Sequence, residues 1–275
     1  MKDTPLYLVP FDFTPVSESA LRLGLDLAIA HNGKVTLLNV VKKQSEKKTT
    51  KTKFSDYVKT LSKEEQEMVQ TRVLIGDLFD SIGIASDLLQ PSLIVLGTHG
   101  AKGFQKIFGS NIVKMISHSS SPFLVTQGKK TVEKINTIVM PFSFDKKTIQ
   151  ITNLATKIAK KFDATIHLVG YHDKDEWLEK HMKSNQLIVR KHLEDNGIKY
   201  VIANIPAGSN YEQGLMNYAQ EQDADLMAAG YYQDGIIKNP NSFIQSMIEN
   251  ELHLPLLTVN AEELGVSTGN IVTAF

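Results

Sequence analysis

The sequence of 275 residues contains no cysteine. This excludes disulfide bonds, thiolate nucleophiles and zinc sites built on cysteine, and it is typical of proteins from a reducing compartment. No apolar run approaches the roughly 20 residues that a membrane-spanning helix needs. The first fifteen residues lack the apolar core of a signal peptide, because Asp3, Pro5 and Pro10 interrupt them. We therefore expect a cytoplasmic protein with no membrane partner.

An excess of charge of one sign is also missing. Thirty basic residues balance thirty acidic ones, which gives a formal net charge of zero. Nucleic-acid-binding domains usually carry a basic excess, so we expect no nucleic-acid partner. The sequence has no Walker loop, G-x-G-x-x-G motif, protein-kinase motif set or G-x-S-x-G elbow. This absence weakens any assignment to an enzyme class, and we expect at most weak ATP hydrolysis.

One pattern is present twice. The stretch 6–41 resembles the stretch 136–171, and identical residues in the two lie 131 positions apart in pairs such as Pro10 and Pro141, or Phe11 and Phe142. Further stretches repeat in the same order, with offsets that drift by a residue or two. The sequence therefore predicts two copies of one domain, 1–128 and 134–275, joined by the polar segment 127–134.

Each copy alternates short apolar runs with amphipathic segments. In the first copy we expect strands at 6–11, 34–41, 69–76, 93–97 and 123–127, and helices from Pro15, at 55–67, at 78–89 and at 110–117. The lysine-rich segment 42–53 has nothing to bury, so we expect a solvated, mobile loop. Alternating strands and helices predict an α/β fold with a parallel sheet, helices on both faces and right-handed crossovers.

Polar and glycine residues gather where three of these strands end. Asp12 follows the first strand, Val40 ends the second, and Gly97 ends the strand before the glycine-rich segment 97–111. Parallel sheets bind ligands at this edge, near the point where strand order reverses. Gly109 and Ser110 open a helix whose free amide groups favour an anion. An ionised carboxylate at Asp12 suits a ribose hydroxyl or a metal bridge.

Each of these residues also has an explanation that needs no ligand. Gly97 could simply end its strand, and Ser110 could be a plain helix cap. Asp12 could form capping hydrogen bonds in the turn that leads into the first helix. Lys102 and Lys106 could supply charge to a phosphate, and the alternative is that the whole segment is a flexible loop across the sheet.

These residues resemble the universal stress protein family in its tandem two-domain form, over nearly the whole chain. In the nucleotide-binding branch of that family an aspartate follows the first strand, a valine ends the second, and a loop G-x2-G-x9-G-[ST] holds the phosphates of ATP. The resemblance implies binding of ATP or AMP, with Mg²⁺ accompanying ATP. The residues that it implies in this site are Pro10, Asp12, Val40, Gly97, His99, Gly100, Gly109, Ser110 and Asn111.

The family resemblance also implies an architecture. Each copy is expected to form a five-stranded parallel sheet with flanking helices, the Rossmann-like three-layer sandwich of adenine-nucleotide alpha-hydrolase-like proteins. Members of the family are usually dimeric through the last strand. Self-association of this chain, or an intramolecular pairing of its two repeats, is therefore expected.

Two departures from the family pattern matter for function. Eight residues, not nine, separate Gly100 from Gly109, which could shift the backbone amides away from the phosphates. In the second copy the motif is lost: Ser143 replaces the aspartate, Gln233 the second glycine, and Asn241 the glycine before the surviving Ser242. We therefore expect at most one nucleotide per chain, in the first copy.

Three functions remain open from the sequence. The first is a stress-response regulatory protein that binds ATP or AMP. The second is a scaffold that binds no nucleotide and acts through protein–protein contacts. The third is a slow phosphohydrolase in which His99 or Asp12 positions water. No catalytic residue is expected, because no serine or cysteine nucleophile with an obvious partner accompanies His99. No metal ligand is expected, because the other histidines are too scattered for metal-ligand spacing.

Overall fold

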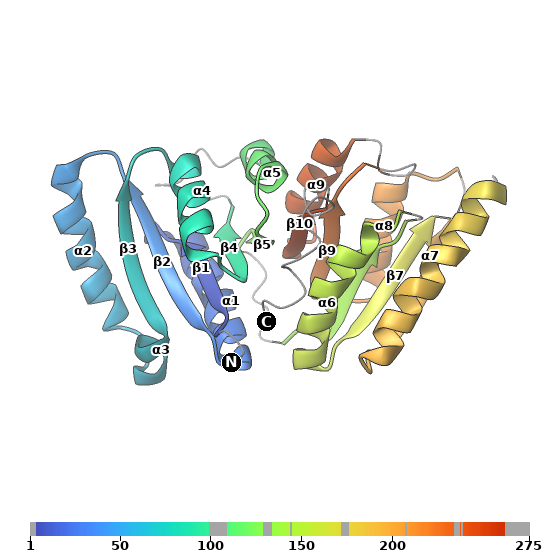
Figure 1. Cartoon of the computed structure of the whole chain (residues 1–275), viewed down its shortest axis with the longest axis horizontal. Helices are drawn as coiled ribbons and strands as arrows, with labels where there is room; N and C mark the ends of the chain where they lie inside the picture. Colours follow the sequence, from blue (N-terminus) through green and yellow to red (C-terminus); the bar gives the residue numbers. More distant parts are fainter. Residues whose placement is uncertain are drawn as a thin grey trace. The chain divides into compact units, whose positions relative to one another are not determined.

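The chain forms two compact α/β units, shown in the computed structural model of Figure 1. The structure describes residues 4–98, 109–128, 134–143, 145–171, 176–206, 208–233, 237 and 239–261, without the side chains of residues 109 and 177–179. Unit 1 lies within residues 1–131 and unit 2 within residues 132–266. Among the described residues, no helix is both long enough and apolar enough to cross a membrane.

Unit 1 is coloured blue to green in Figure 1 and alternates strands with helices. Its sheet is parallel, with the strand order β3-β2-β1-β4-β5. Right-handed crossovers along this order place α1 and α2 on one face of the sheet and α4 and α5 on the other. The elements are β1 (Leu6–Pro10), α1 (Pro15–His31), β2 (Lys34–Val41), α2 (Gln44–Val58), α3 (Lys63–Met68), β3 (Val69–Ile75), α4 (Leu78–Leu89), β4 (Leu93–Gly97), α5 (Gly109–Ser117) and β5 (Phe123–Thr126).

Local sequence signals set the helix ends in unit 1. The Thr14 hydroxyl accepts a hydrogen bond from the Ser17 backbone, and Pro15 occupies the first turn of α1, where a missing amide hydrogen costs nothing. Asp77 caps α4 in the same way, by accepting from the Phe79 backbone at 2.8 Å. Asn32 ends α1 in the left-handed conformation.

Unit 2 is coloured yellow-green to red and repeats this arrangement. Its sheet has the strand order β8-β7-β6-β9-β10 and is also parallel. The elements are β6 (Thr137–Pro141), α6 (Thr148–Phe162), β7 (Thr165–Tyr171), α7 (Glu176–Asp195), β8 (Tyr200–Ile205), α8 (Tyr211–Glu221), β9 (Leu226–Tyr231), α9 (Pro240–Ile248) and β10 (Leu256–Asn260).

The strand registers of the two units are nearly the same. Paired residues of β1 and β2 are 28 positions apart in the sequence, as are those of β6 and β7: Leu6 pairs with Lys34, and Thr137 with Thr165. The β2–β3 and β7–β8 pairs share a separation of 34 positions, as in Val35 with Val69 and Ile166 with Tyr200. Equal separations mean equal crossover lengths, so the duplication in the sequence is also a duplication of structure.

Both faces of each sheet are covered. Neighbouring strand residues point to opposite faces, and Leu8 and Val9 of β1 are both fully buried, as are Ile138 and Val139 of β6. The expected α/β fold, a Rossmann-like parallel sheet with helices on both sides, is therefore confirmed.

Two expected elements are wrong. The helix expected at 55–67 is divided, because its first residues end α2 at Val58 and the rest belong to the separate helix α3, which Ser62 caps. The lysine-rich segment 42–53, expected to be a mobile loop, forms most of helix α2. The carboxylate of Glu46 accepts hydrogen bonds from the backbone of Lys42 and Lys43 at 3.0 and 3.1 Å, which satisfies amides at the start of the helix. Phe54 is the one residue of α2 that is fully buried, and lysine and glutamate have good helix propensity. The buried Phe54, the ring of Tyr57 packed on Phe11, and a capped end therefore suffice to form the helix.

Candidate functional site

The point where strand order reverses in unit 1 lies at β1. The chain runs from β1 through β2 to β3 on one side and then returns to β4 and β5 on the other. Pro10, the last residue of β1, is buried and pairs with Leu38 of β2. Asp12 follows two residues later, at the carboxyl edge between β2 and β4. This is the position where sheets of this topology bind ligands.

Asp12 is held by the turn that starts α1. Its Oδ1 accepts hydrogen bonds from the Thr14 hydroxyl at 2.5 Å and from the Thr14 backbone at 3.2 Å. Its own backbone amide donates to the Ser17 hydroxyl at 3.3 Å. The carboxylate therefore supports the approach to the first helix and is fixed at the sheet edge by the same bonds. Its side chain is half-buried.

An aromatic cluster lies beside this turn. Phe13 adopts a left-handed backbone conformation, with φ of 65°, which is uncommon for a residue with a large side chain. Its ring contacts those of Phe11 and Phe54, with centroids 5.1 Å apart in each case. Tyr57 packs on Phe11 at 4.8 Å. Burial raises the pKa of the Tyr57 hydroxyl, and Glu18 adds to the rise. The cluster joins α2 to the turn that carries Asp12.

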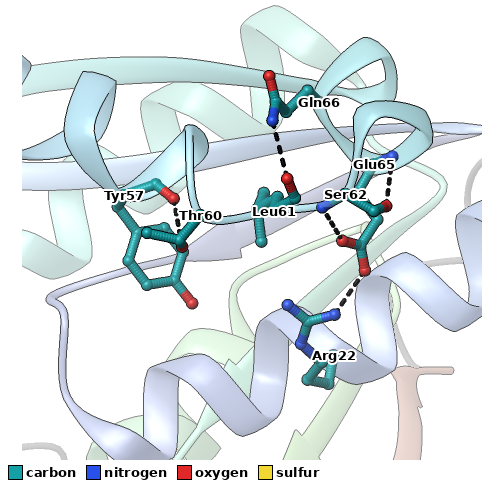
Figure 2. A network of polar contacts seen from close by, with 7 residues as sticks. All are labelled: Arg22, Tyr57, Thr60, Leu61, Ser62, Glu65 and Gln66. Carbon is teal, nitrogen blue, oxygen red and sulfur yellow. Dashed lines mark hydrogen bonds and ion pairs between the residues drawn. The ribbon is translucent and has the colours of Figure 1, made fainter.

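Polar bonds fix the corner where α3 meets α1. Figure 2 shows Glu65 of α3 between Arg22 of α1 and the cap residue Ser62. The guanidinium of Arg22 lies 2.5 Å from one carboxylate oxygen, and the Ser62 backbone donates to the other at 2.8 Å. Burial alone would raise the pKa of Glu65, but the bonds from Ser62 and Arg22 hold it below its usual value. This network ties α3, and with it the end of α2, to α1.

The end of β2 is joined to the end of β1. The Asn39 side chain is buried and donates from Nδ2 to the carbonyl of Phe11 at 2.7 Å, while the Phe11 amide donates to the carbonyl of Leu38 at 2.8 Å. Val40 follows and is half-buried. The structure thus brings Pro10, Asp12 and Val40 to one edge of the sheet, as expected from the sequence.

Gly97 ends β4 against the first turn of α1. A Cβ atom at this position would lie 2.5 Å from Cγ1 of Val16 and 2.6 Å from its carbonyl oxygen. The close approach of α1 to β4 therefore requires glycine here, whether or not a ligand binds. This packing reason was not apparent from the sequence, where Val16 is simply an apolar residue in the first turn.

The remaining expected site residues are only partly described. His99, Gly100, Lys102 and Lys106 lie outside the described residues. Gly109 begins α5, and Ser110 in its first turn is exposed. Asn111 lines a groove of about 450 Å³ between α4 and α5, together with Lys114 and Asp80. Within the described parts of the chain, no cluster of three His, Asp or Glu side chains could hold a metal ion.

The equivalent position in unit 2 is closed by a tyrosine. The hydroxyl of Tyr232 lies 2.9 Å from that of Thr148 and 3.3 Å from that of Ser143, and the latter two are 3.2 Å apart. Tyr232 is 1% exposed and follows β9 directly. Ser143 occupies the position of Asp12. Asn185 of α7 covers the turn by donating to the carbonyls of Ser143 and Asp145 at 2.8 and 2.9 Å.

Tyr232 is a residue that sequence reasoning missed, although a signal existed. The match of 92–97 with 225–230 carries an offset of 133, which aligns Tyr232 with His99. Gly230, the counterpart of Gly97, is also needed for packing, because a Cβ there would lie 2.7 Å from the Tyr232 ring. The two units thus keep glycine at the same point for different reasons.

Taken together, unit 1 is a doubly wound α/β domain with a candidate ligand site at its switch point, and unit 2 is a second copy in which Tyr232 occupies the corresponding position. Residues 7–127 match the family described as the universal stress protein family. Unit 1 therefore belongs to the universal stress protein family, as the resemblance implied. The chain is about twice the length of a single such domain, in agreement with a tandem form.

Solved structures share the fold over nearly the whole chain. A universal stress protein from Archaeoglobus fulgidus aligns with a TM-score of 0.69 and 16% identity, over 94% of this chain and 99% of its own. A protein from Pseudomonas aeruginosa assigned to the same family aligns with a TM-score of 0.66 and 17% identity, over 96% and 99%. A universal stress protein solved in complex with cAMP covers 47% of this chain and 99% of its own, with 12% identity and a TM-score of 0.37. No curated protein matches the sequence.

Proposed function

We propose that unit 1 binds one adenine nucleotide, ATP or AMP, at the carboxyl edge of its sheet, and that the chain acts as a nucleotide-responsive regulatory protein. The observation that carries this proposal is the position of Asp12. Its carboxylate is fixed at the switch point of the parallel sheet by the bonds from Thr14. A carboxylate with a fixed orientation at this edge suits the hydroxyl groups of a ribose.

The neighbouring residues fit the other parts of such a ligand. Val40 and Pro10 border the position of a base next to Asp12. The first turn of α5 offers amide groups and the exposed hydroxyl of Ser110 to phosphate oxygens. Mg²⁺ would accompany ATP through the phosphates. In unit 2 the ring of Tyr232 fills the matching position, which supports a single nucleotide per chain.

A scaffold that binds no nucleotide is the alternative, and two observations favour it. Val16 alone accounts for glycine at position 97. The bonds from Thr14 alone account for an aspartate at position 12. In that case unit 1 would keep these residues for packing, and the chain would act through its surfaces.

Thermal unfolding with ATP and Mg²⁺ separates the two functions. A ligand at 100 times its dissociation constant stabilises the fold by about 2.7 kcal/mol, so a clear rise in the unfolding temperature is expected. Ser110→Ala should reduce the rise. Its matched control is Ser242→Ala, which removes the equivalent exposed hydroxyl in α9 of unit 2.

The outcomes are distinct. A rise that Ser110→Ala reduces and Ser242→Ala does not supports nucleotide binding in unit 1. No rise at millimolar ATP, or equal effects of the two variants, would favour the scaffold.

A further inference from the structure

Helix α2 carries a concentrated positive charge on a chain that is neutral overall. Residues 42–59 contain seven lysines against two carboxylates, Glu46 and Asp56, which gives a formal charge of +5. The whole chain has a net charge of zero. Positive charge is therefore concentrated in this segment, most of which is an ordered helix, and the rest of the chain carries the balancing negative charge.

The lysines of α2 are not packed into the hydrophobic core. Phe54 is the one fully buried residue of the helix, and it faces the aromatic cluster with Phe11 and Phe13. With 3.6 residues per turn, Lys48, Lys51, Ser55 and Lys59 follow one another along one flank of the helix, about 60–140° around its axis from Phe54. All four are exposed. We call these four residues the lysine stripe; its first and last residues are about 16 Å apart along the helix axis.

The charge of the stripe is not neutralised within the helix. Lys48 and Lys51 have no acidic residue three or four positions away, and they lie three positions from each other. Like charges at this spacing destabilise a helix. Among the described residues, neither ammonium group forms an ion pair; Lys59 alone pairs, with Asp56 at 3.2 Å, and both of those side chains are exposed. A binding partner of opposite charge would therefore relieve a repulsion that the fold leaves in place.

We propose that the lysine stripe is a docking surface for an acidic segment of a partner protein. Carboxylates spaced along a helix or an extended strand of the partner match three lysines spread over about 16 Å. The Ser55 hydroxyl between them adds a hydrogen-bond donor.

An acidic protein segment fits better than the other polyanions. The stripe has no arginine, which proteins use to bind phosphates with two hydrogen bonds, and no exposed aromatic residue, which they use to stack on bases. Helix α3, which follows α2 in the chain, carries the exposed carboxylates of Glu64 and Glu67, which would repel a long nucleic acid. A membrane surface would need an apolar face, and that of α2 is used against the cluster.

The test is fluorescence anisotropy of a labelled glutamate-rich peptide with the full chain, in parallel with a DNA duplex of equal charge. The triple variant Lys48→Gln, Lys51→Gln, Lys59→Gln keeps residues of good helix propensity. It should bind the peptide about tenfold more weakly, as expected for the loss of three exposed charge pairs. Binding by the unchanged chain should weaken as salt rises.

Matched variants separate this surface from general charge effects. Lys160→Gln, Lys161→Gln, Lys191→Gln removes the same charge from exposed positions in unit 2 and should leave peptide binding unchanged. Arginine at the three stripe positions should retain it. Equal loss in both triple glutamine variants, no peptide binding by the unchanged chain, or tighter binding of the duplex than of the peptide would each overturn the proposal. The ATP-dependent thermal shift reports on the other site, so either proposal can fail alone.

Discussion

The hydroxyl of Tyr232 lies 2.9 Å from that of Thr148 in a fully buried position at the switch point of unit 2. In unit 1 the aligned residue is His99, and Asp12 stands where unit 2 has Ser143. Unit 2 thus fills this edge of its sheet with its own side chain. Strand order and most strand registers agree between the two units. The two units therefore differ mainly in the side chains at the carboxyl edge of the sheet.

Tyr232→Phe tests the contribution of this contact. The ring remains, but the bonds to Thr148 and Ser143 are lost, so unit 2 should lose about 1 kcal/mol of stability. Chemical denaturation measures the change. The control is Tyr231→Phe, which removes an exposed bond to Asn241 and should cost less than half as much. Equal costs for the two variants would show that the buried hydroxyl does not stabilise unit 2.

Two glycines in unit 1 should respond to alanine with opposite signs. Gly97→Ala places a methyl group 2.5 Å from Val16 and should destabilise unit 1 by about 1–3 kcal/mol through overpacking. Gly83 lies exposed in α4, and a methyl group there meets nothing within 4 Å. Gly83→Ala should therefore stabilise the helix by about 0.5–1 kcal/mol. Urea unfolding of both variants measures these changes in stability. A Gly97→Ala variant as stable as the unchanged chain would contradict the close contact between Gly97 and α1.

Phe54→Ala tests how α2 is attached. Phe54 is 1% exposed and is the main anchor of a helix that is otherwise solvated. Its loss should destabilise unit 1 by about 3 kcal/mol or more and should release α2. Hydrogen exchange would then show faster exchange across 44–58 than in the unchanged chain. Slow exchange that persists in the variant would mean that other contacts hold the helix.

The stability of unit 2 should fall in mild acid because of His167. This side chain is buried between β7 and α8, its Nδ1 lies 2.9 Å from the Tyr218 hydroxyl, and burial lowers its pKa from the ordinary value of 6.5. The unfolded chain then binds a proton more readily than the folded one, so stability decreases as the pH falls below about 6.5. Burial also lowers the pKa of His192 in α7, so this side chain contributes a further loss of stability as the pH falls.

The measurement is the unfolding temperature between neutral and mildly acidic pH. His167→Gln should reduce the slope, and an exposed histidine of the same unit replaced in the same way, His181→Gln, should not. If the unfolding temperature of His167→Gln falls with pH as steeply as that of the unchanged chain, His167 is not the cause of the acid sensitivity.

Much of the fold could be predicted from the sequence, because local signals agreed with burial. The amphipathic run 78–89 matches α4 from Leu78 to Leu89, with Asp77 as its cap. The apolar runs 34–41 and 93–97 match β2 and β4. In each case the pattern that a buried face imposes on the sequence is long enough to read directly.

Other features depend on tertiary contacts that leave little trace in the sequence. Helix α2 was missed because its aromatic contacts come from Phe54 and Tyr57, both near its end, and two apolar residues in one turn produce no periodicity along the rest of the helix. The left-handed Phe13 occupies a conformation that its residue type disfavours, and the aromatic cluster holds it there. The grouping of Pro10, Asp12 and Val40 was predictable, because parallel strands end at one edge. The reason for Gly97 was not, because it depends on Val16 in another element.

The most direct test of the account is the number of nucleotides bound per chain, measured by isothermal titration of the full chain with ATP and Mg²⁺. The account predicts one site, weakened by Ser110→Ala and unaffected by Ser242→Ala, since Tyr232 fills the matching position in unit 2. Two sites per chain, or none, would contradict it.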